Sequence, residues 1–289
     1  MNNKTLIIEP RGGLGNRLLA ISSAINLARD CNIDKIEMLW DNINECGCNY
    51  EDVFSKLPFN FRVKNLKFIN ESYMTMLKHG QIIKAVWKAC QRGAFAVYKL
   101  CVKSYQFEAN SIKSDEEQAQ LKKKILEHNG KRVFIESYNK FYGEVDLSLV
   151  EFNTEVVQKV SEYKESLGEY DAMHIRRTDN AEAIKNSPTE LFYNKIAEIV
   201  KEKNDARIYL ATDDSGILKD LKEKYPDNIF SEASGAVSRR TAEGIRFALY
   251  EMLILAGART LYGSYFSTFS LIANCIGKNE MVVLHIDKK

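Results

Sequence analysis

The first apolar run of the chain, residues 5–10, leads into a glycine-rich turn at 12–15. A helical pattern follows over 16–30, with its apolar side formed by Leu18, Leu19, Ile21, Ile25 and Leu27. A buried strand, a glycine turn and a helix are the opening of a parallel α/β unit. Apolar runs at 36–40 and 133–137 predict two further strands of this unit.

The second half of the chain alternates more regularly. Strands are predicted over 171–176, 207–212, 228–232, 260–264 and 280–287. Helical patterns lie between most of them, at 189–203, 214–224 and 239–257. This alternation predicts a doubly wound parallel sheet, whose ligands bind beyond the carboxyl ends of its strands. The rhythm indicates two α/β domains, 1–150 and 151–289.

The segment 75–107 is mostly helical in pattern and rich in aromatic and basic residues, with Gly93 predicted to break it. One interpretation is a basic amphipathic element that touches a membrane surface or a lipid-linked substrate. The other, which is favoured, is a partly buried helix pair whose lysines are solvated.

Composition and charge narrow the functional classes. Lys and Arg number 41 against 39 Asp and Glu, so a net charge of +2 gives no bulk attraction to nucleic acid. The N-terminal pattern is not that of a signal peptide, and no window reaches the roughly 18 apolar residues of a membrane span. We expect a cytoplasmic protein, with peripheral contact at the inner face of the membrane left open. Six scattered cysteines, with Cys46 and Cys48 lacking a second pair, predict reduced thiols and no metal site.

The densest group of functional side chains is DAMHIRRTDN at 171–180. A strand here places His174 and Arg176 on one face, and Arg177 to Asp179 at the carboxyl end. Two arginines suit a diphosphate, because the guanidinium fork pairs phosphate oxygens bidentately and stays charged. A surface ion-pair cluster is the alternative, and the anion site is favoured.

Two later strand ends are also polar. In YLATDDSG, Asp213 or Asp214 either caps the following helix, which spacing alone favours, or accepts hydrogen bonds from a guanine or a ribose. In YGSYFSTFS, Ser267, Thr268 and Phe269 open a helix whose N–H groups favour phosphate oxygens. Three polar strand ends on one sheet edge indicate a shared site.

The opening glycine loop is neither a P-loop nor a dinucleotide fingerprint, since it lacks the Gly-Lys-Ser/Thr ending and the last glycine. Gly12, Gly13 and Gly15 let the backbone approach a ligand, and Asn16 and Arg17 are placed to reach out from the first helical turn. A tight structural turn explains the glycines equally well.

Together, GGLGN, HIRRTD, ATDD and STFS resemble the fucosyltransferase superfamily, and HIRRTD is most similar to the α1,6-fucosyltransferases of the nodulation and animal core type. The resemblance covers the ends of both halves and most of 170–275, but not 45–130. It implies a GT-B fold, an α/β architecture of two Rossmann-like domains facing a cleft, with the acceptor side in 1–150 and the nucleotide-sugar side in 151–289. It also implies GDP-fucose as donor, inversion at the anomeric carbon, and no metal or other cofactor.

Carried over by position, the resemblance implies that Arg176 binds the β-phosphate and helps GDP leave, with support from Arg177. His174 and Asp213 would hold the guanosine, and Asn16 would contact the donor across the cleft. The diphosphate and base pocket would be lined by Ser267, Thr268 and Phe269.

The catalytic base departs from the pattern of the α1,6 enzymes, which carry a glutamate a few residues beyond the motif. The nearest acid here is Glu182 at a different offset, with Asp179 before it. The predicted function is inverting, metal-independent transfer of L-fucose from GDP-fucose to a hydroxyl of a glycan or lipid-linked saccharide. Alternatives are another nucleotide sugar on the same fold, or a non-catalytic nucleotide- or glycan-binding protein. A dinucleotide oxidoreductase is disfavoured by the missing glycine.

Overall fold

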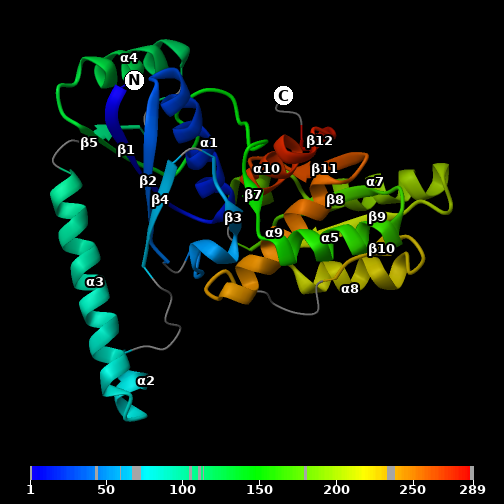
Figure 1. Cartoon of the computed structure of the whole chain (residues 1–289). Coiled ribbons are helices and arrows are strands. Elements are labelled where there is room, and N and C mark those ends of the chain that lie inside the picture. Colours follow the sequence, from blue (N-terminus) through cyan, green and yellow to red (C-terminus); the bar gives the residue numbers. More distant parts are fainter. Residues whose placement is uncertain are drawn as a thin grey trace. The chain divides into compact units, whose positions relative to one another are not determined.

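A computed structural model describes residues 2–42, 45–58, 60–66, 73–103, 106–109, 112, 114–178, 181–232 and 238–286. The chain divides into two compact units (Figure 1). The first comprises Met1–Asn153 with Arg239–Ile245, and the second comprises Thr154–Ser238 with Arg246–Lys289. Each unit holds one five-stranded parallel sheet, so each is an α/β layer structure in its own right.

The sheet of the first unit has the strand order β4-β2-β1-β6-β5. Its strands are β1 (Asn2–Pro10), β2 (Ile33–Trp40), β4 (Asn60–Asn65), β5 (Gln106–Glu108) and β6 (Arg132–Ser137). Central β1 is buried along Leu6 to Pro10, because a parallel sheet is covered on both faces. The remaining elements near this sheet are α1 (Leu14–Asp30), η1 (Tyr50–Asp52), α4 (Asp115–Glu127) and the antiparallel pair β3 (Phe54–Lys56) and β7 (Glu151–Phe152).

Two helices, α2 (Tyr73–Lys78) and α3 (Ile82–Lys103), confirm the helical pattern of the middle segment. The predicted break at Gly93 is wrong, since α3 continues through it. A Cβ there would meet no described atom within 4 Å, and a glycine in an exposed helix interior costs only about 1 kcal/mol. The C-terminal part of α3 packs on the sheet through Phe95, Tyr98 and Val102.

The sheet of the second unit has the order β10-β9-β8-β11-β12, which confirms the predicted doubly wound arrangement. Its strands are β8 (Asp171–Ile175), β9 (Ile208–Thr212), β10 (Ile229–Phe230), β11 (Thr260–Ser264) and β12 (Glu280–Leu284). The helices are α5 (Thr154–Leu167), α6 (Ala181–Asn186), α7 (Thr189–Glu202), α8 (Ser215–Lys224), α10 (Thr268–Gly277) and, from Arg246 onward, α9 (Ala242–Ala256). The strand order reverses around β8, which lies between β9 and β11, so the topological switch point of the sheet is at β8.

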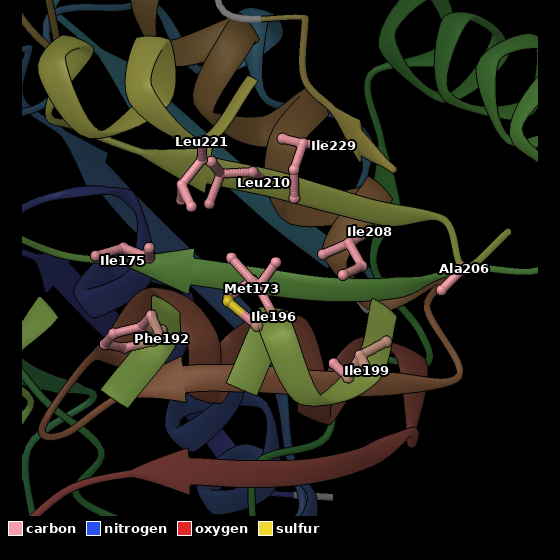
Figure 2. Packing of buried hydrophobic residues seen from close by; sticks show 10 residues of the cluster. All are labelled: Met173, Ile175, Phe192, Ile196, Ile199, Ala206, Ile208, Leu210, Leu221 and Ile229. Carbon is pink, nitrogen blue, oxygen red and sulfur yellow. The ribbon is translucent and has the colours of Figure 1, made fainter. Parts of the chain in front are cut away.

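The core of the second unit fixes the register of β8. Figure 2 shows Met173 and Ile175 of β8 beside Ile208 and Leu210 of β9, with side chains of α7 packed against them. At the amino end of β8, the Arg259 guanidinium donates to both carboxylate oxygens of Asp171, at 3.1 and 2.8 Å. The strand is therefore held along its length and at its start, which leaves its carboxyl end to position polar groups.

Candidate functional site

Polar side chains gather where β8, β9 and β11 end, at the switch point of the second sheet. His174 is the last residue but one of β8, Asp213 follows β9 directly, and Ser264 ends β11. β8 pairs with both neighbours, His174 lying opposite Ala211 and Gly263. Ligands of doubly wound sheets bind at this place.

The Asp213 carboxylate organises the turn that follows β8. Its Oδ1 accepts from the Arg177 N–H at 2.7 Å, and its Oδ2 accepts from the N–H and hydroxyl of Thr178 at 3.3 and 2.7 Å. Oδ2 also lies 3.2 Å from Nε of Arg176. Oδ2 therefore faces three donors and Oδ1 receives one, so the carboxylate ties together three consecutive residues of the turn.

The next residue, Asp214, caps a helix. Asp214 is the N-cap of α8, and its Oδ1 accepts from the N–H groups of Gly216 and Ile217 at 2.8 and 3.1 Å. Capping, which spacing favoured for one of the two acids, therefore belongs to Asp214, while Asp213 binds the turn after β8.

The guanidinium of Arg177 is engaged by protein groups on every nitrogen. Nε donates to the Thr189 hydroxyl at 2.9 Å, Nη1 to the Arg176 carbonyl at 2.7 Å, and Nη2 to the Ser187 carbonyl at 2.6 Å. Its carbon Cζ lies 5.6 Å from the centre of the Phe192 ring. Burial lowers the pKa of Arg177, yet an arginine remains charged in a protein. Arg177 thus ties the turn to the start of α7.

Arg176, the other arginine of this turn, is partly exposed. Its backbone N–H donates to the Ser264 hydroxyl at 3.0 Å, and that hydroxyl donates to the His174 carbonyl at 3.1 Å. The side chain is 27% exposed and pairs with Asp213 through Nε. The backbone of Arg176 is fixed from β11, while its guanidinium lies where an anion can reach it.

His174 lies beneath this surface. Its Nδ1 is 2.8 Å from the Ser270 hydroxyl and 3.4 Å from that of Ser267, and the Phe269 ring centre is 4.9 Å from its own. Burial and the neighbouring Arg176 charge lower the pKa of His174 to about 3. The imidazole is therefore neutral at physiological pH and acts as a hydrogen-bonding group.

The segment after β11 approaches β8 closely. Ser267 is the N-cap of α10 and accepts from the Ser270 N–H at 3.4 Å. A Cβ on Gly263 would stand 2.9 Å from the Ser270 Cβ, so this position requires glycine.

Phe266 has a φ of 54° and is 76% exposed, and Thr268 begins α10 half-buried. An exposed aromatic side chain in the left-handed region is strained, and such strain clusters at functional sites.

Two residues of this region were missed by the sequence analysis. The Ser187 hydroxyl donates to the Leu284 carbonyl and accepts from the Tyr265 N–H, and its carbonyl accepts from Arg177. Glu251 of α9 is half-buried with its Oε1 enclosed, and desolvation together with the Asp213 charge raises its pKa to about 8. Neither lies in a motif, since Ser187 is an isolated loop serine and Glu251 is a single acid within the apolar C-terminal part of α9.

Glu182 and Asp179 are the two candidates for the catalytic base. Glu182 is exposed on α6, and its Oε2 accepts from the Asn186 side chain at 3.1 Å. Asp179 lies outside the described residues.

In the first unit, the glycine loop joins β1 to α1. Gly13 is the N-cap of α1, Gly15 lies in its first turn, and Asn16 is half-buried. Gly12 has a φ of 79°, and a Cβ there would lie 3.1 Å from the Asn16 amide nitrogen. The loop therefore needs glycine at this position.

The expectation that Arg17 reaches out to a ligand is wrong, because its side chain is buried. Nε donates to the Gly12 carbonyl at 3.0 Å and Nη2 to the Asp41 carbonyl at 2.6 Å, while Cζ lies 4.4 Å from the Trp40 ring centre. Arg17 holds the loop from within.

Across the described ranges, His, Cys, Asp and Glu side chains form no group of three or more that could hold a metal ion. Among the helices that the structure describes, none has the length and apolar character needed to cross a membrane.

The two parallel five-stranded sheets define an α/β fold of the GT-B fucosyltransferase kind, as predicted. Fucosyltransferase NodZ from Bradyrhizobium matches at a TM-score of 0.56 and 14% identity, over 94% of this chain and 92% of that chain. A variant of Arabidopsis thaliana FUT1 in complex with GDP matches at a TM-score of 0.58 and 15% identity, over 97% and 70%.

POFUT1 in complex with GDP matches at a TM-score of 0.58 and 11% identity, over 99% of this chain and all of that chain (100%). No protein-family model and no curated protein sequence matches the chain. At these identities the likeness is one of fold.

Proposed function

We propose that the protein is an inverting glycosyltransferase that moves L-fucose from GDP-fucose to a hydroxyl of a glycan or lipid-linked saccharide, without a metal. The observation that carries the proposal is Arg176, an accessible guanidinium at the sheet's switch point whose backbone is fixed by Ser264 and whose turn is held by Asp213. The solved structures of similar fold that hold GDP or GDP-fucose support the choice of donor.

In the proposed reaction, the acceptor oxygen attacks the anomeric carbon from the face opposite the diphosphate. The bond between that carbon and the β-phosphate oxygen breaks, and GDP leaves with the electron pair. Arg176 stabilises the negative charge that grows on the departing phosphate, as a preorganised donor in place of a metal. Arg177 acts as a positioning residue, because its Nη1 holds the Arg176 carbonyl.

The proton of the acceptor hydroxyl must pass to a base. We assign this role to Glu182, which is exposed on α6 in the chain segment directly after the arginines, with Asp179 as the other acid of this segment. A base has to reach the hydroxyl that it deprotonates, and an exposed carboxylate can do so.

The remaining donor contacts are proposed for the groups around α10. Ser267, Thr268 and Phe269 line the diphosphate and base pocket, with neutral His174 beneath them. Asp213 is proposed to hold the guanosine together with His174, and it also organises the turn that carries Arg176. In the first unit, which we assign to acceptor binding, the loop of Gly13, Gly15 and Asn16 is proposed as a ligand-facing turn.

The test compares Arg176→Ala with Arg207→Ala, an exposed arginine at the amino end of β9 in the same sheet. GDP affinity is measured by calorimetry and GDP release from GDP-fucose by a coupled assay, both in excess EDTA. We expect Arg176→Ala to lower turnover by about 10²–10³, the typical effect of removing one donor aimed at developing charge, while Arg207→Ala retains it.

Several outcomes would contradict the proposal. Loss of activity in EDTA that Mg²⁺ or Mn²⁺ restores would contradict a metal-free mechanism. Cleavage of GDP-mannose or a UDP-sugar in place of GDP-fucose would reject fucose. Binding of GDP with no turnover of any sugar donor would indicate a binding protein.

A further inference from the structure

The outer face of α3 is apolar and exposed. Ile83 is 88% and Leu100 is 73% exposed. At least half of the side chain is exposed also at Ile82, Val86, Trp87 and Val97 of α3 and at Met74 and Leu77 of α2. Figure 1 shows α3 as a long helix of the first unit that extends away from the sheet, with α2 beside its first turns. A solvent-exposed apolar face of this extent marks an interaction site.

The polar and apolar side chains of α3 are separated around the helix. At about 100° per residue, one arc of about 140° contains Ile82, Ile83, Val86, Trp87, Val97 and Leu100. A second arc of about 100° on the opposite side contains Lys84, Lys88, Arg92, Lys99 and Lys103. Phe95, Tyr98 and Val102, which pack on the sheet, all lie outside the apolar arc, so that arc is turned away from the sheet.

The charged residues of α2 and α3 are all basic. Residues 73–103 contain six of the 41 basic residues and no Asp or Glu. The rest of the chain has 35 basic residues against all 39 acidic ones, so the excess positive charge is concentrated here. Lys99 and Lys103 pair with Glu9 and Glu136 of the sheet. The positive charges of the helix portion distant from the sheet are Lys78, Lys84, Lys88 and Arg92.

We propose that α2 and α3 bind the surface of an anionic lipid bilayer, with the apolar arc of α3 inserted at the level of the headgroups. A helix with a Trp- and Leu-bearing apolar face and a Lys- and Arg-rich polar face has the chemistry of an interfacial element. The acidic headgroups complement the basic residues, and each Lys or Arg near such a surface raises binding about fivefold. A second copy of the chain fits less well, because it would bring together two segments that both contain basic and no acidic residues.

The test uses the whole protein and phosphatidylcholine vesicles with and without phosphatidylserine. Trp87 lies on the apolar face, whereas the chain's other tryptophan, Trp40, is buried. We expect co-sedimentation with the anionic vesicles, a blue shift of Trp87 emission that is absent in Trp87→Phe, and weakening by salt. The variant K84Q/K88Q/R92Q should bind about a hundredfold more weakly.

Two variants separate charge from apolar contact. The control K56Q/K123Q/K219Q removes three exposed lysines elsewhere in the chain and should bind like the parent protein. The variant I83Q/L100Q, altered only on the outer face, should lose both binding and the blue shift. Absence of vesicle binding would overturn the proposal. A blue shift without vesicles that follows protein concentration would overturn it in favour of self-association.

Discussion

The carboxylate of Asp213 holds Thr178 twice, through its hydroxyl at 2.7 Å and its backbone N–H at 3.3 Å. Asp213, which follows β9, thus shapes the turn after β8. Thr178 and Asp213 lie 35 positions apart in the chain. Accessible Arg176 lies in the same turn, so the geometry of its guanidinium depends on a residue of a different strand.

Adjacent Asp213 and Asp214 should respond differently to the same substitution. Asp213→Asn replaces an acceptor oxygen by an NH₂ donor facing bound N–H groups, so we expect a loss of about 1–3 kcal/mol in the free energy of unfolding. GDP affinity should fall with it. Asp214→Asn should be nearly neutral, because asparagine caps helices as well as aspartate. Denaturant unfolding with and without GDP measures both, and equal losses in the two variants would contradict this division of roles.

Glu251 should make stability depend on pH. Its pKa in the folded protein is raised from 4.5 to about 8, so the folded state holds the proton more tightly than the unfolded state. The stabilisation is complete below about pH 4.5 and is lost as pH rises to about 8, at about 1.4 kcal/mol per pH unit.

Replacing Glu251 by its uncharged analogue should remove this dependence. Urea unfolding of Glu251→Gln between about pH 5 and pH 8 should give a flatter profile than the parent protein. Glu243→Gln, at an exposed position of the same helix, serves as the control and should leave the slope unchanged. A slope that survives in Glu251→Gln would show that another group titrates.

Two glycines should respond to alanine with opposite signs. Gly263→Ala places a methyl group 2.9 Å from the Ser270 Cβ, which must displace α10 and its contact with His174, so we expect a loss of about 1–3 kcal/mol. Gly93→Ala, in open space within α3, should gain about 1 kcal/mol from helix propensity. Thermal unfolding of the two variants tests this, and destabilisation by Gly93→Ala would indicate that the α3 surface is not open.

Replacing Phe266 by glycine should raise the stability of the protein and lower its affinity for GDP. Phe266→Gly relieves a φ of 54° in a residue that is already exposed, so the free energy of unfolding should rise by about 1 kcal/mol or more. If the ring stacks on the nucleobase, GDP affinity should fall by at least about fivefold, as for other base-stacking aromatics. Thermal unfolding and calorimetry measure the two effects, and unchanged GDP affinity would show that the Phe266 ring does not stack on the nucleobase.

Much of the fold could be predicted because its strands are covered on both faces. The stretches 6–8 and 208–211 are continuously apolar for that reason, and the alternation of strands with helices then predicts a parallel sheet. Gly93 misled the prediction since a helix exposed to solvent tolerates glycine when its neighbours are strong helix formers.

The sequence was enough to predict which strand ends form the candidate site, but not how its side chains are oriented. Polar residues at three strand ends had to meet at one sheet edge, and His174, Arg176 and Asp213 do. Spacing does not reveal which guanidinium is turned inward, because burial of a cation depends on distant partners. Ser187 approaches Arg177 only in three dimensions, and Arg17 is buried over an aromatic ring supplied by the next strand.

The buried Arg17 has a consequence for the dynamics of the glycine loop. Consecutive glycines lose more conformational entropy on ordering than other residues, and a mobile loop would lose it when a ligand arrives. Here the Gly12 carbonyl is already fixed by Arg17 within the core. The ordering entropy is therefore lost during folding, and any ligand that meets this loop encounters a preorganised backbone.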